Sequence, residues 1–457
     1  MAIVVEGFDP DAIALARFLA DEGRTVRLAG DAAEPGEAAE LRAQGIHVEP
    51  HADLDTDPGP AEIAYLDVWT PDTAPRVHRL REQGTRVSCL ADLVLERWPG
   101  PSIGITGTAG KTTTTSLVAA ILRAAEMDVV VSSTARAGNL WPTGELLDRL
   151  RPGRREAEDA VLLLELTSSH LAFMHTSPTI AAVTSFWPDH LELHGDLARY
   201  RVAKQTIVRH QHAGDTVVVN ADDPSADFAA LTPAARVEFS LSHPVRRGAY
   251  LDEIRGVVLL DSAGELTLGP IHESKAHAGN VVAAAAIARA AGADYDAIDT
   301  GIRLAAPLPW RAQALGTLGG VPVVDDGMAA TPLKGSATLA GYPGASVVLI
   351  AGGMNDAGGG PVHATREEHA LLVRACDEIA RAARLVVVFG AGGARLARLL
   401  RQRDVEIRAA ADLSEAVAIA AGSVEGAAAV VFSPLFPVTL EDRARFAVLV
   451  REHDARP

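Results

Sequence analysis

A glycine-rich segment between an apolar run and an amphipathic stretch is the clearest sign of chemistry in this sequence. Residues 102–122 read SIGITGTAGKTTTTSLVAAIL, so a predicted strand enters the segment and a predicted helix leaves it. Backbone N–H groups of such a loop bind phosphate, Lys111 adds a positive charge, and the Thr112 hydroxyl can bind Mg²⁺. We predict an enzyme that uses ATP or GTP; the alternative is a structural turn with an incidental lysine. The expected nucleotide-binding residues here are Gly107, Thr108, Ala109, Gly110, Lys111, Thr112 and Thr113.

Two later apolar runs also end in residues that bind metals or phosphate. Glu165 ends the run AVLLLE, and the run TIAAVTS leads to Asp189, His190, His194 and Lys204. Ligands of parallel sheets bind at the carboxyl ends of the strands, and Mg²⁺ prefers oxygen ligands. Glu165 is therefore a candidate metal ligand, His190 could bind a metal, and Lys204 could face phosphate or carry a modification. A capping glutamate and a satisfied structural histidine are the alternatives at these positions.

The elements that must position these residues follow from the hydrophobic pattern. Short β-branched runs alternate with Ala-, Leu- and Arg-rich stretches of helical period, which predicts an α/β fold with mostly parallel sheets. Proline and glycine mark junctions near residues 97–102 and 305–311. We expect three domains: a Rossmann-like domain over 1–98, a central phosphate-loop domain over 99–304, and a Rossmann-like domain over 305–457. Strands are expected at 2–7, 25–30, 102–106, 128–133, 160–166, 180–186, 216–220, 322–326, 346–353, 385–392 and 428–433.

The composition of the 457 residues excludes several classes of protein. The 42 Lys and Arg against 59 Asp and Glu residues give a formal net charge of −17. A chain this acidic repels phosphate backbones, so we expect no nucleic acid partner. Cys89 and Cys376 match neither a disulfide framework nor a zinc site, and there is no basic leader or long apolar run. We therefore expect a cytoplasmic protein with no membrane partner. We also expect it to be a monomer.

Taken in order, the motifs resemble those of the Mur ligases. They are GTAGKTT, ELTSS, PDHLELHG and YRVAK, together with GNL at 138–140, NADDP at 220–224, LPWR at 308–311, the pair Asp325–Asp326, and SPLFPVTLEDRARF at 433–446. The resemblance covers almost the full chain and is strongest to the glutamate-adding members. It implies three domains that bind, in turn, a nucleotide-sugar acid, ATP with Mg²⁺, and an amino acid.

The resemblance also implies a reaction. A substrate carboxylate attacks the γ-phosphate of ATP, and an amine then displaces phosphate from the acyl phosphate to form an amide. Lys111 would neutralise charge, Thr112 and Glu165 would hold one Mg²⁺, and His190 would help to hold a second. Lys204 would be carbamylated, which converts a cation into an acidic metal ligand. The expected activity is the addition of glutamate to UDP-N-acetylmuramoyl-L-alanine in peptidoglycan synthesis.

The other expected contacts follow from motif position within the same resemblance. Asn280, Arg311 and Asp326 are expected to contact ATP, with Arg311 near phosphate and Asp326 near ribose. The residues expected to contact the two other substrates are Asn139, Thr70, His170, Asp356, Thr439, Leu440 and Phe446.

The amino-acid site departs from the family pattern. The family stretch Asp-Ser-Lys-Ala-Thr-Asn reads DGMAAT at 326–331, without its lysine, and Asp356 stands where a Gly-Gly-x-x-Lys loop supplies a cation. Replacing a cation by an anion disfavours a carboxylate ligand. Lys334 could compensate, and a slipped alignment with a solvated Asp356 is the alternative. L-glutamate and a cationic amine are therefore candidates beside D-glutamate.

The first domain departs as well. Family members have a glycine-rich turn after the first strand, whereas this chain has Glu6, Asp9 and Asp11, which would oppose a pyrophosphate. The segment TPD at 70–72 stands where the family has Ser-Pro-Gly. This domain could hold the nucleotide-sugar precursor through other contacts, or it could serve a different carboxylic acid.

Two further hypotheses stay open at the level of sequence. One is a Mur-type ligase of another pathway that joins a different acid to a different amine. The other is a non-catalytic partner protein that binds nucleotide, against which the retention of Lys111, Thr112, Glu165, His190 and Lys204 argues. A GTPase-like switch is disfavoured because no separate base-recognition motif occurs.

Overall fold

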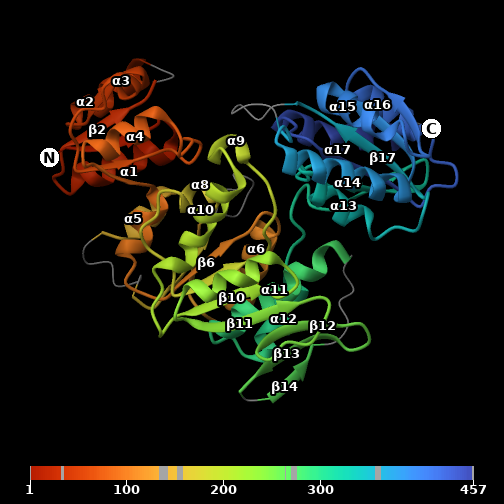
Figure 1. The fold of residues 1–457 in the computed structure, drawn as a ribbon, viewed down its shortest axis with the longest axis horizontal. Coiled ribbons are helices and arrows are strands. Elements are labelled where there is room, and N and C mark those ends of the chain that lie inside the picture. Colours follow the sequence, from red (N-terminus) through yellow and green to blue (C-terminus); the bar gives the residue numbers. More distant parts are fainter. Residues whose placement is uncertain are drawn as a thin grey trace. The chain divides into compact units, whose positions relative to one another are not determined.

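The computed structural model describes residues 2–31, 35–132, 143–151, 158–262, 264–268, 275–355 and 362–454. The chain divides into two compact units, and Figure 1 labels elements of both. The first consists of residues 1–187, 193–271 and 280–305, and the second of 188–192, 272–279 and 306–457. The first unit contains two sheets and the second contains one.

The first sheet is a five-stranded parallel sheet in the order β3-β2-β1-β4-β5. Its strands are β1 (Ile3–Glu6), β2 (Val26–Ala29), β3 (His47–Glu49), β4 (Ile63–Tyr65) and β5 (Arg86–Ser88). Its helices are α1 (Pro10–Asp21), α2 (Pro35–Ala43), α3 (His51–Thr56), α4 (Pro75–Glu82) and α5 (Leu90–Arg97). The direction of winding reverses between β1 and β4, and such a switch point is where doubly wound sheets bind ligands.

The second sheet has nine strands in the order β14-β13-β12-β11-β10-β9-β6-β8-β7. Its parallel strands are β6 (Ser102–Thr106), β7 (Val129–Ser132), β8 (Val161–Glu165), β9 (Ile180–Val183), β10 (Thr216–Asn220), β11 (Ala235–Ser240) and β12 (Gly248–Asp252). An antiparallel extension adds β13 (Gly256–Asp261) and β14 (Gly264–Thr267). The associated helices are α6 (Lys111–Ala124), α7 (Thr143–Arg149), α8 (Ser168–Leu171), α9 (Leu191–His194), α10 (Leu197–Arg209), the 3₁₀ helix η2 (Pro224–Leu231), α11 (Lys275–Ala290) and α12 (Tyr295–Leu304).

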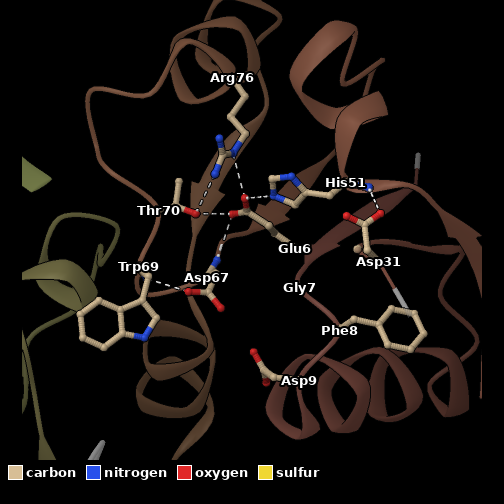
Figure 2. Close-up of a pocket in the computed structure, with 11 residues that line it drawn as sticks. Glu6, Gly7, Phe8, Asp9, Asp31, His51, Asp67, Trp69, Thr70 and Arg76 are labelled. Atoms are coloured by element: carbon tan, nitrogen blue, oxygen red, sulfur yellow. Dashed lines mark hydrogen bonds and ion pairs between the residues drawn. The ribbon is translucent and has the colours of Figure 1, made fainter. Parts of the chain in front are cut away.

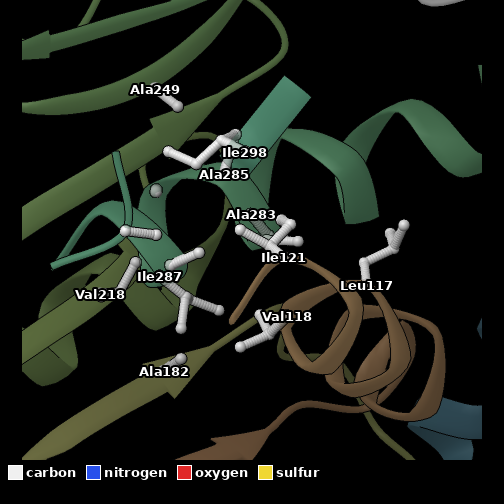
Figure 3. Packing of buried hydrophobic residues seen from close by; sticks show 14 of the residues in the cluster. Leu117, Val118, Ile121, Ala182, Val218, Ala249, Ala283, Ala285, Ile287 and Ile298 are labelled. Carbon is white, nitrogen blue, oxygen red and sulfur yellow. The ribbon is translucent and has the colours of Figure 1, made fainter. Parts of the chain in front are cut away.

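The core of this second sheet lies between its strands and the helices α6, α11 and α12 (Figure 3). Helix α11 contributes small side chains, including Ala283 and Ala285, and α6 contributes Val118 and Ile121, all fully buried. Small residues let helices approach closely, and α12 places Gly301 against α6, where a Cβ would lie 2.4 Å from the Cα of Ile121. This packing supports the helix that begins at Lys111.

A buried carboxylate joins the first sheet to the second within the first unit. Asp92 of α5 is fully buried. Its Oδ1 accepts hydrogen bonds from the backbone N–H of His175 at 2.8 Å and from the N–H and hydroxyl of Thr176 at 3.1 and 2.7 Å. Its Oδ2 accepts from Ser88 at 2.8 Å and Arg86 at 3.2 Å. The carboxylate thus connects the end of the first sheet to the loop that precedes β9.

The third sheet, in the second unit, has the order β15-β16-β20-β17-β18-β19 and is parallel except for the pair β15 and β16. The strands are β15 (Gln313–Leu318), β16 (Val321–Asp325), β17 (Val347–Gly352), β18 (Ala383–Phe389), β19 (Glu406–Ala409) and β20 (Ala429–Leu435). The helices are α13 (Pro332–Leu339), α14 (Arg366–Ala382), α15 (Gly390–Leu400), α16 (Leu413–Ala421) and α17 (Leu440–Asp454).

The structure confirms the predicted α/β class with mostly parallel sheets. The three sheets occupy residues 3–88, 102–267 and 313–435, whereas the compact units number two, so the three-domain boundaries stay a prediction. Cys89 and Cys376 are both buried free thiols. In the described part of the chain, no helix has the length and apolar character needed to cross a membrane.

Candidate active site

The phosphate loop lies where β6, which is flanked by β9 and β8 in the second sheet, passes into α6. Gly107 has φ 155° and Gly110, which precedes the helix, has φ 84°. A Cβ on Gly107 would lie 1.9 Å from Oγ1 of Thr184, and a Cβ on Gly110 would lie 2.4 Å from Oδ1 of Asn280. Both positions therefore require glycine. Gly110, the residue that precedes α6, provides no side-chain cap, and an uncapped helix start of this kind suits an anion such as phosphate.

Neighbouring strand ends hold this loop in shape. Ser185, just after β9, accepts the N–H of Ala109 on its hydroxyl at 2.9 Å and the N–H of Thr108 on its carbonyl at 3.0 Å. The Thr108 hydroxyl lies 2.9 Å from the Tyr200 hydroxyl, and Thr184 donates to the Ala109 carbonyl. These hydrogen bonds hold the loop in place, which favours pre-organised phosphate binding.

The lysine and threonine of the loop lie next to a carboxylate. Lys111 donates to the Gly107 carbonyl at 2.8 Å, so its ammonium group lies over its own loop. The Thr112 hydroxyl donates to Oε1 of Glu165 at 2.9 Å, and Glu165, the last residue of β8, is only 5% exposed. A hydroxyl beside a carboxylate is a set of hard oxygen ligands that suits Mg²⁺.

The Thr112 hydroxyl and the Glu165 carboxylate can supply only part of the coordination shell of a metal ion. The described residues contain no group of three His, Cys, Asp or Glu side chains that could hold a metal ion. A magnesium ion at Thr112 and Glu165 would therefore need oxygens from the nucleotide as well, as is usual for Mg²⁺ at phosphates.

Lys204 lies near the carboxyl end of β6, close to the phosphate loop. It belongs to α10 and is 1% exposed, with Nζ 3.3 Å from the Thr106 hydroxyl and 5.0 Å from the centre of the Tyr200 ring. Thr106 is the last residue of β6, one position before the phosphate loop. A buried lysine at this place is suited to modification that removes its charge, because a buried charge is costly.

Three further predicted residues belong to the first unit. Asn280 of α11 approaches Thr114 of α6 at 3.4 Å and fills the space beside Gly110. His170 forms a capping box with Thr167 at the start of α8. Burial lowers the pKa of His170 to about 4, so its ring is neutral at physiological pH. Thr70 belongs to the pocket described below.

His190 belongs to the second unit. It adopts φ 53°, and its neighbour Asp189 raises the pKa of its imidazole. Its Nδ1 lies 3.2 Å from Oε1 of Glu192, and Lys334 Nζ lies 3.7 Å from Oδ2 of Asp189. Lys334, the cation that could compensate in the amino-acid site, thus pairs with Asp189.

A buried pair of aspartates marks the carboxyl edge of the third sheet. Asp326 accepts hydrogen bonds from Thr338 at 2.7 Å, Ser433 at 3.3 Å and the Ala312 N–H at 3.2 Å. Burial raises its pKa to about 6, and the positive charge of Arg311 opposes that shift. Burial also raises the pKa of Asp325 to about 7. The pair places two weakly acidic groups at this edge.

The three residues predicted from the C-terminal motif have different surroundings. At the start of α17, the Thr439 hydroxyl donates to Oδ2 of Asp442 at 2.8 Å and accepts the Asp442 N–H at 2.9 Å. Leu440 is 65% exposed, and Phe446 is fully buried with its ring 4.5 Å from that of Phe432. Capping and core packing account for Thr439 and Phe446, and substrate contact by all three stays a prediction. Asn139 and Asp356 lie outside the described residues.

A pocket of about 450 Å³ opens at the switch point of the first sheet (Figure 2). Glu6, the last residue of β1, lies at its base and is 3% exposed. Its Oε1 contacts His51 at 2.9 Å and Arg76 at 2.8 Å, and its Oε2 accepts from the Thr70 hydroxyl at 2.7 Å and the Asp67 N–H at 3.1 Å. Glu6 thus pairs with Arg76 and hydrogen-bonds the ring of His51, the two basic side chains that line the pocket.

Several of these residues were missed by sequence reasoning. Thr184 and Ser185 hold the phosphate loop, and their only signal was two hydroxyls at the end of a predicted strand. His51, Asp67 and Arg76 line the first-sheet pocket, and nothing in their local sequence indicated it because strand order brings them together.

Comparison with known proteins gives consistent matches. A model of the Mur ligase middle domain matches residues 105–256. A UDP-N-acetylmuramoylalanine–D-glutamate ligase of Frankia casuarinae is 36% identical, with 78% of this chain and 74% of the relative covered. One of Symbiobacterium thermophilum is 32% identical, with 94% and 92% covered.

Solved structures share the fold at low sequence identity. The MurF ligase of Thermotoga maritima in complex with ADP has a TM-score of 0.62 at 16% identity, over 94% of this chain and 95% of that chain. A pseudomurein peptide ligase of type C from Methanothermus fervidus has a TM-score of 0.61 at 14% identity, with 99% of both chains covered.

Proposed function

The chain belongs to the Mur ligase family, and on that premise we propose that it joins glutamate to UDP-N-acetylmuramoyl-L-alanine with conversion of ATP to ADP and phosphate. The observation that carries the proposal is the phosphate loop: an uncapped helix start with Lys111 above it and the Thr112–Glu165 contact beside it. The relatives are named UDP-N-acetylmuramoylalanine–D-glutamate ligases, and these names supply the two substrates.

In the proposed reaction the alanyl carboxylate attacks the γ-phosphorus of ATP. The bond between the γ-phosphorus and the β–γ bridging oxygen breaks. ADP departs, and the phosphoryl group stays on the carboxylate as an acyl phosphate. The amine of glutamate then attacks the acyl carbon, phosphate leaves, and the nitrogen loses a proton. Because two anions must meet in the first step, the loop N–H groups and Lys111 lower the barrier by neutralising charge on the phosphates.

We assign the other residues by their position. Thr112 and Glu165 would bind Mg²⁺, which supplies further positive charge to the phosphates. His190 would help to hold a second ion, and Lys204 would do so once carbamylated. Asn280, Arg311 and Asp326 would contact ATP, whereas Asn139, Thr70, His170, Asp356, Thr439, Leu440 and Phe446 would contact the acid or the amino acid. A monomeric state and a cytoplasmic location stay predictions.

The proposal is tested by ADP release from the purified full chain. The chain is incubated with ATP, Mg²⁺ and UDP-N-acetylmuramoyl-L-alanine, with D-glutamate or L-glutamate as the amine. We expect ADP release that needs both substrates, and Lys111→Ala should lower its rate by at least about a hundredfold, because the charge at the phosphates is lost. Arg123→Ala, at the exposed far end of the same helix, should keep the wild-type rate.

The outcomes separate the competing functions. ADP release only with another acid or a cationic amine would indicate a Mur-type ligase of a different pathway. The absence of ADP release with every acid and amine, despite ATP binding, would indicate a non-catalytic partner protein. Unchanged turnover in Lys111→Ala would overturn the assignment of the phosphate loop.

A further inference from the structure

The first-sheet pocket carries an unusual balance of charge. Its lining residues include four carboxylates, those of Glu6, Asp9, Asp31 and Asp67, against one arginine and one histidine. Both basic side chains contact Glu6, and Arg76 also pairs with Asp55 at 3.0 Å. The remaining carboxylates therefore face the cavity without an available cation among its described lining residues.

Asp9 also occupies the helix start at which a phosphate would bind. Helix α1 begins after Asp9, and Oδ1 of Asp9 accepts the N–H groups of Asp11 at 2.7 Å and Ala12 at 3.1 Å. Aspartate is a common helix cap, but this one also lines the pocket. In the phosphate loop, by contrast, no described side chain caps the start of α6.

Asp9 and Asp67 converge on the same turn (Figure 2). A Cβ on Gly7 would lie 3.4 Å from Oδ2 of Asp9 and 3.7 Å from Oδ2 of Asp67. The neighbouring charges of Asp9 and Glu6 add to burial in raising the pKa of Asp67. An incoming phosphate would meet this same negative charge at short range, and like charges at such distances repel strongly.

We propose that Asp9 determines specificity by disfavouring phosphate in this pocket, so that an acid substrate bound here is recognised through groups other than a phosphate. The inference rests on one part of the proposed function, namely that this pocket is the site of the acid substrate. A UDP-linked acid would then gain no affinity here from its diphosphate.

The test compares the binding of uridine and UDP to the full chain by isothermal titration calorimetry. Saturating ADP is present so that UDP cannot use the phosphate loop. For the wild type we expect UDP to bind no more tightly than uridine. Asp9→Ala, which frees the N–H groups of α1 and removes the charge, should raise UDP affinity about tenfold or more and change uridine affinity less than about twofold.

Two more variants separate the effects of charge and cap. Asp9→Asn removes the charge but keeps a capping side chain, so it should fold and give a smaller gain in UDP affinity. Asp11→Asn removes the same charge from the first turn of α1 without touching the pocket, and should change neither affinity. Two results would overturn the proposal. One is that UDP binds the wild type tenfold more tightly than uridine. The other is that UDP affinity is the same, or absent, in the wild type, Asp9→Ala and Asp9→Asn alike.

Because binding is measured without catalysis, its result is independent of the ligase assay. Failure of ADP release would refute the proposed substrates and leave the role of Asp9 standing, whereas a tight UDP complex in the wild type would refute the role of Asp9 and leave the ligase reaction standing.

Discussion

Asp325 and Asp326 are adjacent carboxylates with different surroundings. Asp325 is fully buried, and its Oδ1 accepts the Gly327 N–H at 2.9 Å. Asp326 is held by Thr338 and Ser433. Burial raises both pKa values, to about 7 and about 6, and so favours the protonated forms near the lower end of the physiological range.

These shifts predict how stability depends on pH. Because the pKa of Asp325 rises from 3.8 to about 7 on folding, the folded chain binds more protons than the unfolded chain between those values. The free energy of unfolding should therefore fall as the pH rises through this window. The Asp325→Asn side chain has no proton to lose in this pH window. This variant should therefore reduce the pH-dependent fall in the free energy of unfolding by on the order of 2–4 kcal/mol.

Urea unfolding of the full chain at a series of pH values measures this effect. Asp404→Asn, at an exposed position of the same unit, is the matched control and should keep the wild-type dependence on pH. An identical slope in Asp325→Asn and the wild type would show that Asp325 ionises as it does in the unfolded chain.

At the scale of elements, the contact between α6 and α12 positions the phosphate loop. A Cβ on Gly301 would lie 2.4 Å from the Cα and 2.6 Å from the N of Ile121, so backbone rather than a flexible side chain blocks the space. Gly301→Ala should destabilise the first unit by about 1–3 kcal/mol, because overpacking forces the helices apart. Denaturant unfolding, followed by ATP binding to the folded fraction, measures both consequences.

The same substitution elsewhere provides the control for this prediction. A Cβ on Gly36 of α2 would have no described heavy atom within 4 Å, and alanine favours helix more than glycine does. Gly36→Ala should therefore leave stability unchanged or raise it slightly. Equal effects of the two substitutions would mean that helix propensity, and not the approach of α12 to α6, governs Gly301.

The elements were predictable because their signals are local. Alternating β-branched and helical runs indicated the strands, and the loop from Gly107 to Thr113 was visible as glycine, lysine and threonine in sequence. The supports of the site were not, since Ser185 holds Ala109 and Asp67 faces Asp9 only after strands distant in sequence become neighbours. Roles taken from motif position, such as that of Phe446, gave no information on burial, which tertiary packing decides.

At the scale of the whole molecule, Asp92 makes the two sheets of the first unit depend on each other. Asp92→Ala would remove five hydrogen bonds from a fully buried carboxylate and leave the N–H groups of His175 and Thr176 without that acceptor. The free energy of unfolding should fall by on the order of 2–4 kcal/mol. Limited proteolysis should then cut near residues 97–102, where the chain passes between the sheets.

An exposed ion pair between the same two parts of the chain gives the comparison. Asp21 contacts Arg151 at 2.8 Å, with side chains 59% and 38% exposed. Asp21→Ala should change stability by less than about 0.5 kcal/mol, because water screens such pairs. If both variants resist protease as the wild type does, the sheets are held together by contacts other than Asp92.

The position of Asp92 also has a consequence for synthesis on the ribosome. Its N–H partners come 83 and 84 residues later in the chain, so they emerge after the strands of the first sheet are complete. Until then Oδ1 of Asp92 lacks these partners, and burying it would be costly, so the final placement of α5 is disfavoured. The nascent N-terminal segment should therefore reach protease resistance only when the loop before β9 has left the exit tunnel, and folding of the first sheet is tied to translation of the second.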